Sequence, residues 1–143
     1  MPSIDGTYQT MIAVRYANHI ELITDTLMAR VTLRDVGYRG RFEGSYETAF
    51  GDSGLVAGME RPESTLVVEV FGAAPKPMAY VMGLRRLFPW CAFPRLGIGP
   101  LLGRLRADSL LLEGGGSLPC FYHLYGVPVE IGTKLDFTIV GVR

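Results

Sequence analysis

The sequence predicts a mainly-β protein, folded as one small antiparallel β-barrel of about seven to eight strands. Apolar and polar residues alternate along most of the chain, which is the period-two pattern of strands with one buried face. Glycine accounts for 18 and proline for 9 of the 143 residues, a composition that favours turns and bent strands over long helices. No linker or internal repeat divides the chain, so we expect residues 1–143 to form a single β-barrel domain.

The clearest hairpin is predicted between residues 27–34 and 38–47, which alternate strictly on either side of a turn at Asp35–Gly37. In its second strand, aromatic residues alternate with glycine. This order is typical of a strand that bends strongly, because an interior glycine relieves crowding at the bend. The predicted inner face of that strand is Tyr38, Gly40, Phe42, Gly44 and Tyr46.

Further strands are predicted at 8–16, 20–24, 55–59 and 65–71, and the longest at 129–142. Residues 109–125 are predicted as two shorter strands, 109–113 and 120–125. We expect a flexible turn between them because Gly114, Gly115 and Gly116 follow one another directly.

The period changes in a cationic, apolar excursion at about residues 77–103. Between Pro77 and Phe88, apolar residues recur at three- and four-residue steps, which predicts one short helix that ends before Pro89. Residues 90–103 contain two prolines and three glycines and are predicted as an irregular loop.

This set of strands resembles, in architecture alone, the small barrels of the lipocalin and allene oxide cyclase kind. The interior of an eight-stranded barrel is either filled by side chains or hollow enough for one small ligand. Both alternatives stay open for this chain.

Positive charge is concentrated in residues 70–107, where six basic residues occur without one acid, although the whole chain is neutral. The only tryptophan, Trp90, lies in the same segment. Four interpretations stay open: a cap on the core, a lid over one barrel mouth, a surface for a partner subunit or an anionic membrane, and an anion site in which Arg85 and Arg86 clamp a carboxylate or phosphate. An isoelectric point near 6.7 argues against a nucleic-acid partner.

His123 and Tyr125 are the candidate catalytic residues. They lie two positions apart, so alternation places them on one face of the predicted strand 120–125. If that face lines the barrel, the pair can exchange a proton with a bound molecule. The competing interpretation is a structural histidine bonded to a backbone carbonyl. Glu69 is a second possible inward polar group, with a solvent-facing carboxylate as its alternative.

No cofactor or metal is expected, because the two cysteines and two histidines form none of the local pairs that zinc sites use. The N-terminal residues do not have the pattern of a signal peptide. The longest uncharged run, residues 114–129, is broken by glycine and proline, so a cytoplasmic location is expected.

The sequence therefore predicts that the barrel binds an apolar small molecule, with metal-free isomerase or cyclase chemistry at His123 and Tyr125 as an extension. The alternative is a non-catalytic module, homo-oligomeric or membrane-peripheral, that uses residues 78–102 as its contact surface. The predicted ligand-binding residues are Tyr38, Phe42, Tyr46, Glu69, Arg85, Arg86 and Trp90.

Overall fold

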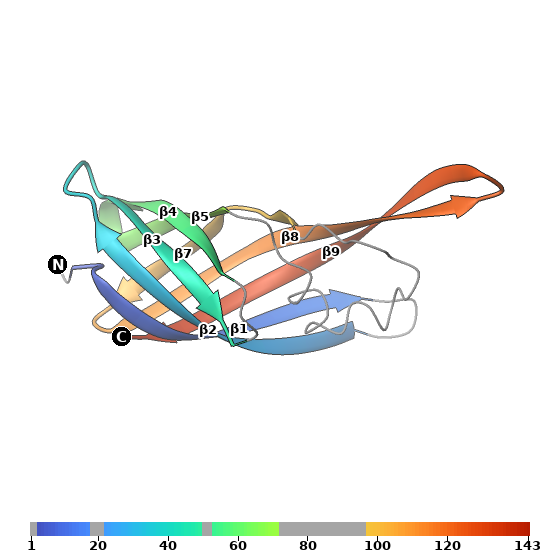
Figure 1. The fold of residues 1–143 in the computed structure, drawn as a ribbon. Coiled ribbons are helices and arrows are strands. Elements are labelled where there is room, and N and C mark those ends of the chain that lie inside the picture. The colour runs from blue at the N-terminus through green and yellow to red at the C-terminus, as the bar shows by residue number, and fades with distance from the viewer. Residues whose placement is uncertain (1–2, 18–21, 50–52, 72–96) are drawn as a thin grey trace.

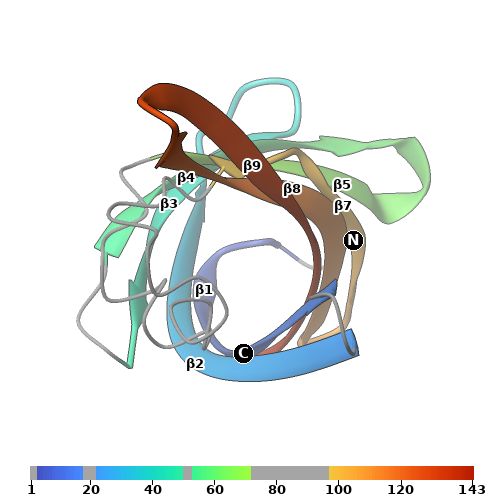
Figure 2. The same cartoon turned by 90° about the vertical axis from the view of Figure 1, so that its right-hand side faces the viewer.

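The computed structural model describes residues 3–17, 22–49, 53–71 and 97–143, and within them eight strands form a closed antiparallel barrel (Figures 1 and 2). Each strand pairs with the next one along the chain, and the last strand pairs with the first, so the barrel is of the up-and-down kind. The strands are β1 (Gly6–Ala17), β2 (Leu22–Asp35), β3 (Arg41–Thr48), β4 (Ser53–Arg61), β5 (Thr65–Phe71), β7 (Leu101–Arg106), β8 (Ser109–Leu124) and β9 (Val127–Val142).

Two short elements complete the described structure. The 3-10 helix η1 (Pro62–Ser64) joins β4 to β5. The two-residue strand β6 (Gly97–Ile98) pairs with β8 at Ser117 and Gly116 and lies on the same side of β8 as β7.

The predicted alternation of β2 is confirmed. Leu27, Ala29 and Leu33 are buried, whereas Met28 and Arg30 on the opposite face are exposed. All eight strands of the barrel contribute buried aliphatic or aromatic side chains to one core cluster.

Gly44 lets β3 approach β2 more closely than any other residue would allow. A Cβ atom built on Gly44 would lie 1.8 Å from the carbonyl oxygen of Thr32, a distance that real Cβ atoms do not show. The alternation of aromatic residues with glycine in β3 is therefore typical of a tightly bent strand, as the sequence predicts.

The prediction of two strands and a turn between residues 109 and 125 is wrong. Strand β8 is continuous, and Gly114, Gly115 and Gly116 pair in order with Phe137, Asp136 and Leu135 of β9. A Cβ atom on Gly114 would lie 2.6 Å from the Leu101 side chain. The glycine therefore provides room for a core residue of the neighbouring strand.

The irregular loop predicted through residue 103 is also wrong at its end, because β7 begins at Leu101. Leu101 and Leu105 are buried, whereas Leu102, Arg104 and Arg106 are exposed on the outer face. Two basic residues of the predicted cationic segment, Arg104 and Arg106, therefore belong to the barrel wall. The helix predicted at residues 77–88 lies outside the described residues.

Strands β8 and β9 continue past the rest of the barrel as a two-stranded arm (Figure 1). Within the described chain, the pairing of β9 with β1 ends at Leu135, whereas its pairing with β8 continues as far as Val127. The two chain termini lie at the opposite end of the molecule (Figure 1).

Candidate functional site

An apolar pocket lies inside the barrel. Three of its lining residues, Tyr46, Val70 and Ile98, are half-buried. Among the described residues that line it, the Tyr46 hydroxyl is the only side-chain polar group. The lining residues are Ile12, Ala29, Val31, Leu33, Tyr46, Val56, Val68, Val70, Ile98, Leu101, Leu110, Leu112, Phe137 and Ile139.

The cavity volume is about 60 Å³. A closed apolar cavity of about 150 Å³ is known to hold benzene, so this space is narrower than one aromatic ring requires. An empty space of this kind also lacks the polar groups that hold ordered water.

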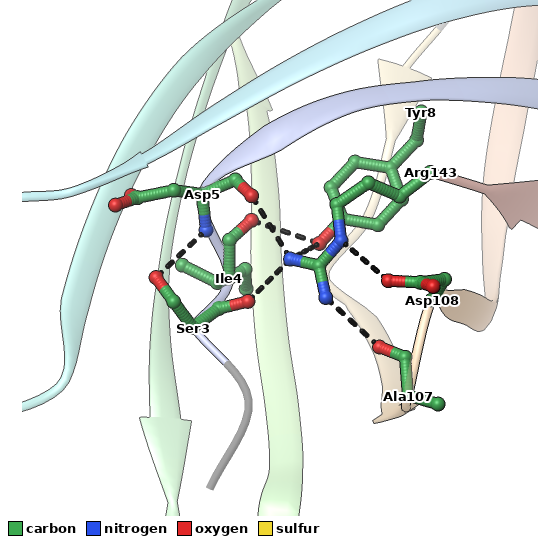
Figure 3. Close-up of polar contacts among 7 residues, drawn as sticks. All are labelled: Ser3, Ile4, Asp5, Tyr8, Ala107, Asp108 and Arg143. Carbon is green, nitrogen blue, oxygen red and sulfur yellow. Dashed lines mark hydrogen bonds and ion pairs between the residues drawn. The ribbon is translucent and has the colours of Figure 1, made fainter.

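At the end of the barrel where the chain termini lie, a polar cluster surrounds Arg143 (Figure 3). The Arg143 guanidinium donates to the carbonyl oxygens of Ser3, Asp5 (2.9 Å) and Ala107 (3.0 Å) and to the Tyr8 hydroxyl (3.1 Å). Its Nε lies 3.1 Å from the Asp108 carboxylate. One side chain thus joins the N-terminal segment, β1 and the turn between β7 and β8.

Tyr8 lies beneath this cluster with no exposed surface. Its hydroxyl donates to the Ile4 carbonyl oxygen at 2.8 Å. Burial raises the pKa of the Tyr8 phenol above its ordinary value of 10.0, because the phenolate would lose its hydration, and the nearby Arg143 cation opposes part of this shift.

This pKa shift predicts a loss of stability in alkaline solution. Below pH 10 the phenol is neutral in both the folded and the unfolded chain, so it has no effect on the pH dependence. Above pH 10 the unfolded chain loses the proton more readily, and the free energy of unfolding falls. Urea denaturation between about pH 8 and 11 should show a smaller decline for Tyr8→Phe than for the wild type.

Tyr38→Phe serves as the control for this experiment, because the Tyr38 side chain is 54% exposed. It should decline with pH as the wild type does. Equal slopes for all three proteins would contradict the assignment of the alkaline loss to Tyr8.

Of the aromatic residues predicted on the inner face of β3, only Tyr46 lines the pocket. Phe42 is inward and buried, but it belongs to the core: a Cβ on Gly58 would lie 2.4 Å from its ring. Tyr38 is not on the inner face. It lies in the turn before β3, where Gly37 and Gly40 have positive φ angles, so the turn is longer than predicted and leaves Tyr38 exposed.

Glu69 does not point into the barrel. It is exposed on β5 and follows the inward residue Val68 by one position, so strand alternation directs it to solvent. The solvent-facing interpretation, which the sequence favours for an acid on a strand, is therefore confirmed, and Glu69 does not line the pocket.

The predicted inward position of Tyr125 is also wrong. Tyr125 forms the turn between β8 and β9 with a φ angle of 51°, and its side chain is 97% exposed. His123 pairs with Pro128 near the tip of the arm. Pairing of β8 with β9 continues through His123 to Leu124, and neither His123 nor Tyr125 is among the residues that line the pocket.

Arg85, Arg86 and Trp90 lie outside the described residues, as does most of the predicted contact surface at 78–102. At the C-terminal end of that surface, the apolar residues lie on different sides of the barrel wall. Ile98 and Leu101 line the pocket, whereas Leu102 is exposed.

The residues that sequence reasoning missed are the aliphatic side chains of the pocket. Val31, Val56, Val70 and Ile139 occupy inward positions of alternating strands, so their direction is visible in the sequence. Their contact with the pocket is not, because it depends on how far the opposite wall lies from each of them.

Among the described residues, no group of three histidine, cysteine, aspartate or glutamate side chains is placed to hold a metal ion. The described chain also contains no helix with the length and apolar character needed to cross a membrane.

The fold defines the class: an up-and-down antiparallel β-barrel with an apolar pocket inside it. Comparisons with protein-family models, curated proteins and solved structures give no match for this chain.

Proposed function

We propose that this protein binds an apolar small molecule inside the barrel. The observation that supports the proposal is the pocket, whose described lining is aliphatic and aromatic apart from the Tyr46 hydroxyl. Ligand sites are usually concave and mostly apolar, with few polar groups that fix orientation.

The preferred ligand is a narrow aliphatic chain that enters end-on. A cavity of about 60 Å³ holds only the end of such a chain. The described lining contains no carboxyl, imidazole or amine group, so the proposal concerns binding. The Tyr46 hydroxyl is its only side-chain proton donor for isomerase or cyclase chemistry.

Straight-chain primary alcohols of increasing length test the proposal. Each buried methylene contributes about 0.8 kcal/mol, so the association constant should rise about fourfold per carbon until the cavity is full. Isothermal titration calorimetry should also show a negative heat-capacity change, the signature of apolar burial.

Val70→Phe should abolish this binding, because the larger side chain fills the cavity that Val70 lines. Val67→Phe is the matched control. Val67 is a half-buried valine of the same strand, but it occupies an outward position between the buried residues Leu66 and Val68. It should bind as the wild type does.

Two results would refute the proposal. One is an absence of binding across the alcohol series for a folded wild-type protein. The other is equal binding by the Val70→Phe and Val67→Phe variants, which would place the alcohols outside the barrel.

A further inference from the structure

The outer surface of four adjacent strands carries an unbroken apolar row. Met28 of β2 pairs with Met11 of β1, Met11 pairs with Val140 of β9, and Val140 pairs with Leu111 of β8. Their exposed fractions lie between 43% and 54%, and Val142 beside them is 56% exposed. We call Met11, Met28, Leu111, Val140 and Val142 the Met11 face.

The neighbouring outer surface, between β2 and β3, is built differently. There, Arg30 forms an ion pair with Glu47 at 3.1 Å, and Arg34 pairs with Glu43. Polar residues outside and apolar residues inside are the usual arrangement of an antiparallel sheet with one solvated face. The Met11 face departs from this arrangement, and contiguous exposed apolar surface usually marks an interaction site.

Charges beside the Met11 face identify the partner. Arg15 of β1 and Asp136 of β9 are register partners, four positions along their strands from Met11 and Val140. Both are exposed, and their side chains are not among the ion pairs of the described residues. The surface thus presents one positive and one negative group on either side of the seam between β1 and β9.

A two-fold axis that runs along this seam makes the surface complementary to itself. Such an axis places each β1 residue opposite its β9 register partner in a second copy. Met11 then faces Val140 and Arg15 faces Asp136 of the second copy, twice in the pair. A two-fold axis at right angles to the strands, passing through Met11 and Val140, would place Arg15 opposite Thr7 of the second copy. It would bring no opposite charges together.

We propose that the Met11 face binds a second copy of this chain, with the two-fold axis along the seam between β1 and β9. Apolar side chains cover one another at the centre of this contact, and the two symmetry-related Arg15–Asp136 pairs lie beside them. The contact is separate from the pocket, which lies inside the barrel, so dimer formation and ligand binding are independent.

Sedimentation equilibrium from about 1 to 100 µM measures the association. The wild type should form dimers. Met11→Lys should raise the dissociation constant about tenfold or more, because two buried ammonium groups would replace apolar contacts. Met59→Lys is the matched control, since Met59 is 37% exposed on the outer face of β4, which is three strands away from β1.

A mixing experiment tests the axis itself. Arg15→Asp alone and Asp136→Arg alone each place like charges opposite one another in their own dimers, so each should associate about tenfold or more weakly than the wild type. An equimolar mixture should recover tight association as a heterodimer, because both contacts between unlike copies then join opposite charges. Within each chain the two positions remain like-charged, so recovery reports the contact between copies.

Three outcomes would overturn the proposal. A wild-type protein that stays monomeric over the whole concentration range excludes the dimer. Weakening by Met59→Lys but not by Met11→Lys moves the contact to another face. A mixture that associates no better than its two components excludes the axis along this seam.

Discussion

Replacement of Gly103 with alanine is expected to lower the free energy of unfolding by about 3 kcal/mol or more. Gly103 lies in β7 between its pairing partners Leu66 and Leu112. A Cβ atom there would lie 1.7 Å from the carbonyl oxygen of Leu111. That oxygen belongs to the backbone of β8, so the clash is relieved only when the two strands separate.

Gly115→Ala is the matched control for this variant. Gly115 lies in β8 and is paired with Asp136. Like Gly103, it does not have a positive φ angle. A Cβ atom on it would lie 3.6 Å from the nearest backbone oxygen, an ordinary contact. Urea denaturation followed by far-ultraviolet circular dichroism should leave Gly115→Ala close to the wild type. Equal loss in the two variants would mean that space does not explain the effect at Gly103.

Arg143→Ala is expected to cost about 2–3 kcal/mol and to lower the Tm by roughly 6–12 °C. The Arg143 side chain is only 20% exposed, and it donates to the carbonyl oxygens of Asp5 and Ala107 and to the Tyr8 hydroxyl. Its removal leaves these acceptors without their guanidinium donor. The guanidinium carbon also lies 5.4 Å from the centre of the Tyr8 ring, a cation–π contact that disappears as well.

Comparison with Arg30→Ala distinguishes the effect of burying the guanidinium from the effect of its ion pair. Arg30 and Arg143 each lie 3.1 Å from a carboxylate, but the Arg30 side chain is 56% exposed. Its loss should cost at most about 1 kcal/mol, as for other surface ion pairs. Arg143→Lys should recover only part of the stability, because an ammonium group cannot reach partners on several sides as the planar guanidinium does. Similar Tm values for Arg143→Ala and Arg30→Ala would refute the structural role of this cluster.

The strands with clean alternation could be predicted from the sequence because each has one buried face. Thr65–Phe71 is a strand in both the prediction and the structure, with Leu66 and Val68 inside. The same pattern in residues 27–34 continues without a break into residues 22–26, which the sequence analysis separated. Alternation locates a strand well but defines its ends poorly.

The turn prediction was wrong where glycine leaves space for a neighbouring side chain. Gly114, Gly115 and Gly116 resemble a turn because glycine tolerates turn conformations, yet all three are extended between β9 and the neighbouring strands. Only the packing of Leu101 against Gly114 shows why one of them is needed there. That contact joins residues of different strands and is invisible to a local pattern.

Function was harder to predict than fold, for a related reason. His123 and Tyr125 were chosen because their chemistry is versatile, and alternation could say only that they share a face if the strand continued. The strand instead ends at Leu124, and the turn exposes Tyr125 at the tip of the arm. Tyr46 lines the pocket because it occupies an inward position of β3, as strand alternation predicts.

By itself, the sequence determined that this chain is a β-barrel and which side of most strands is buried, because period-two burial is a local property of extended backbone. The tertiary structure alone decided where the pocket lies inside the barrel. The Arg143 cluster, the pocket and the Met11 face each combine residues from strands far apart in the chain. The distances between the residues of each group follow from strand register and barrel curvature, which depend on many strands at once.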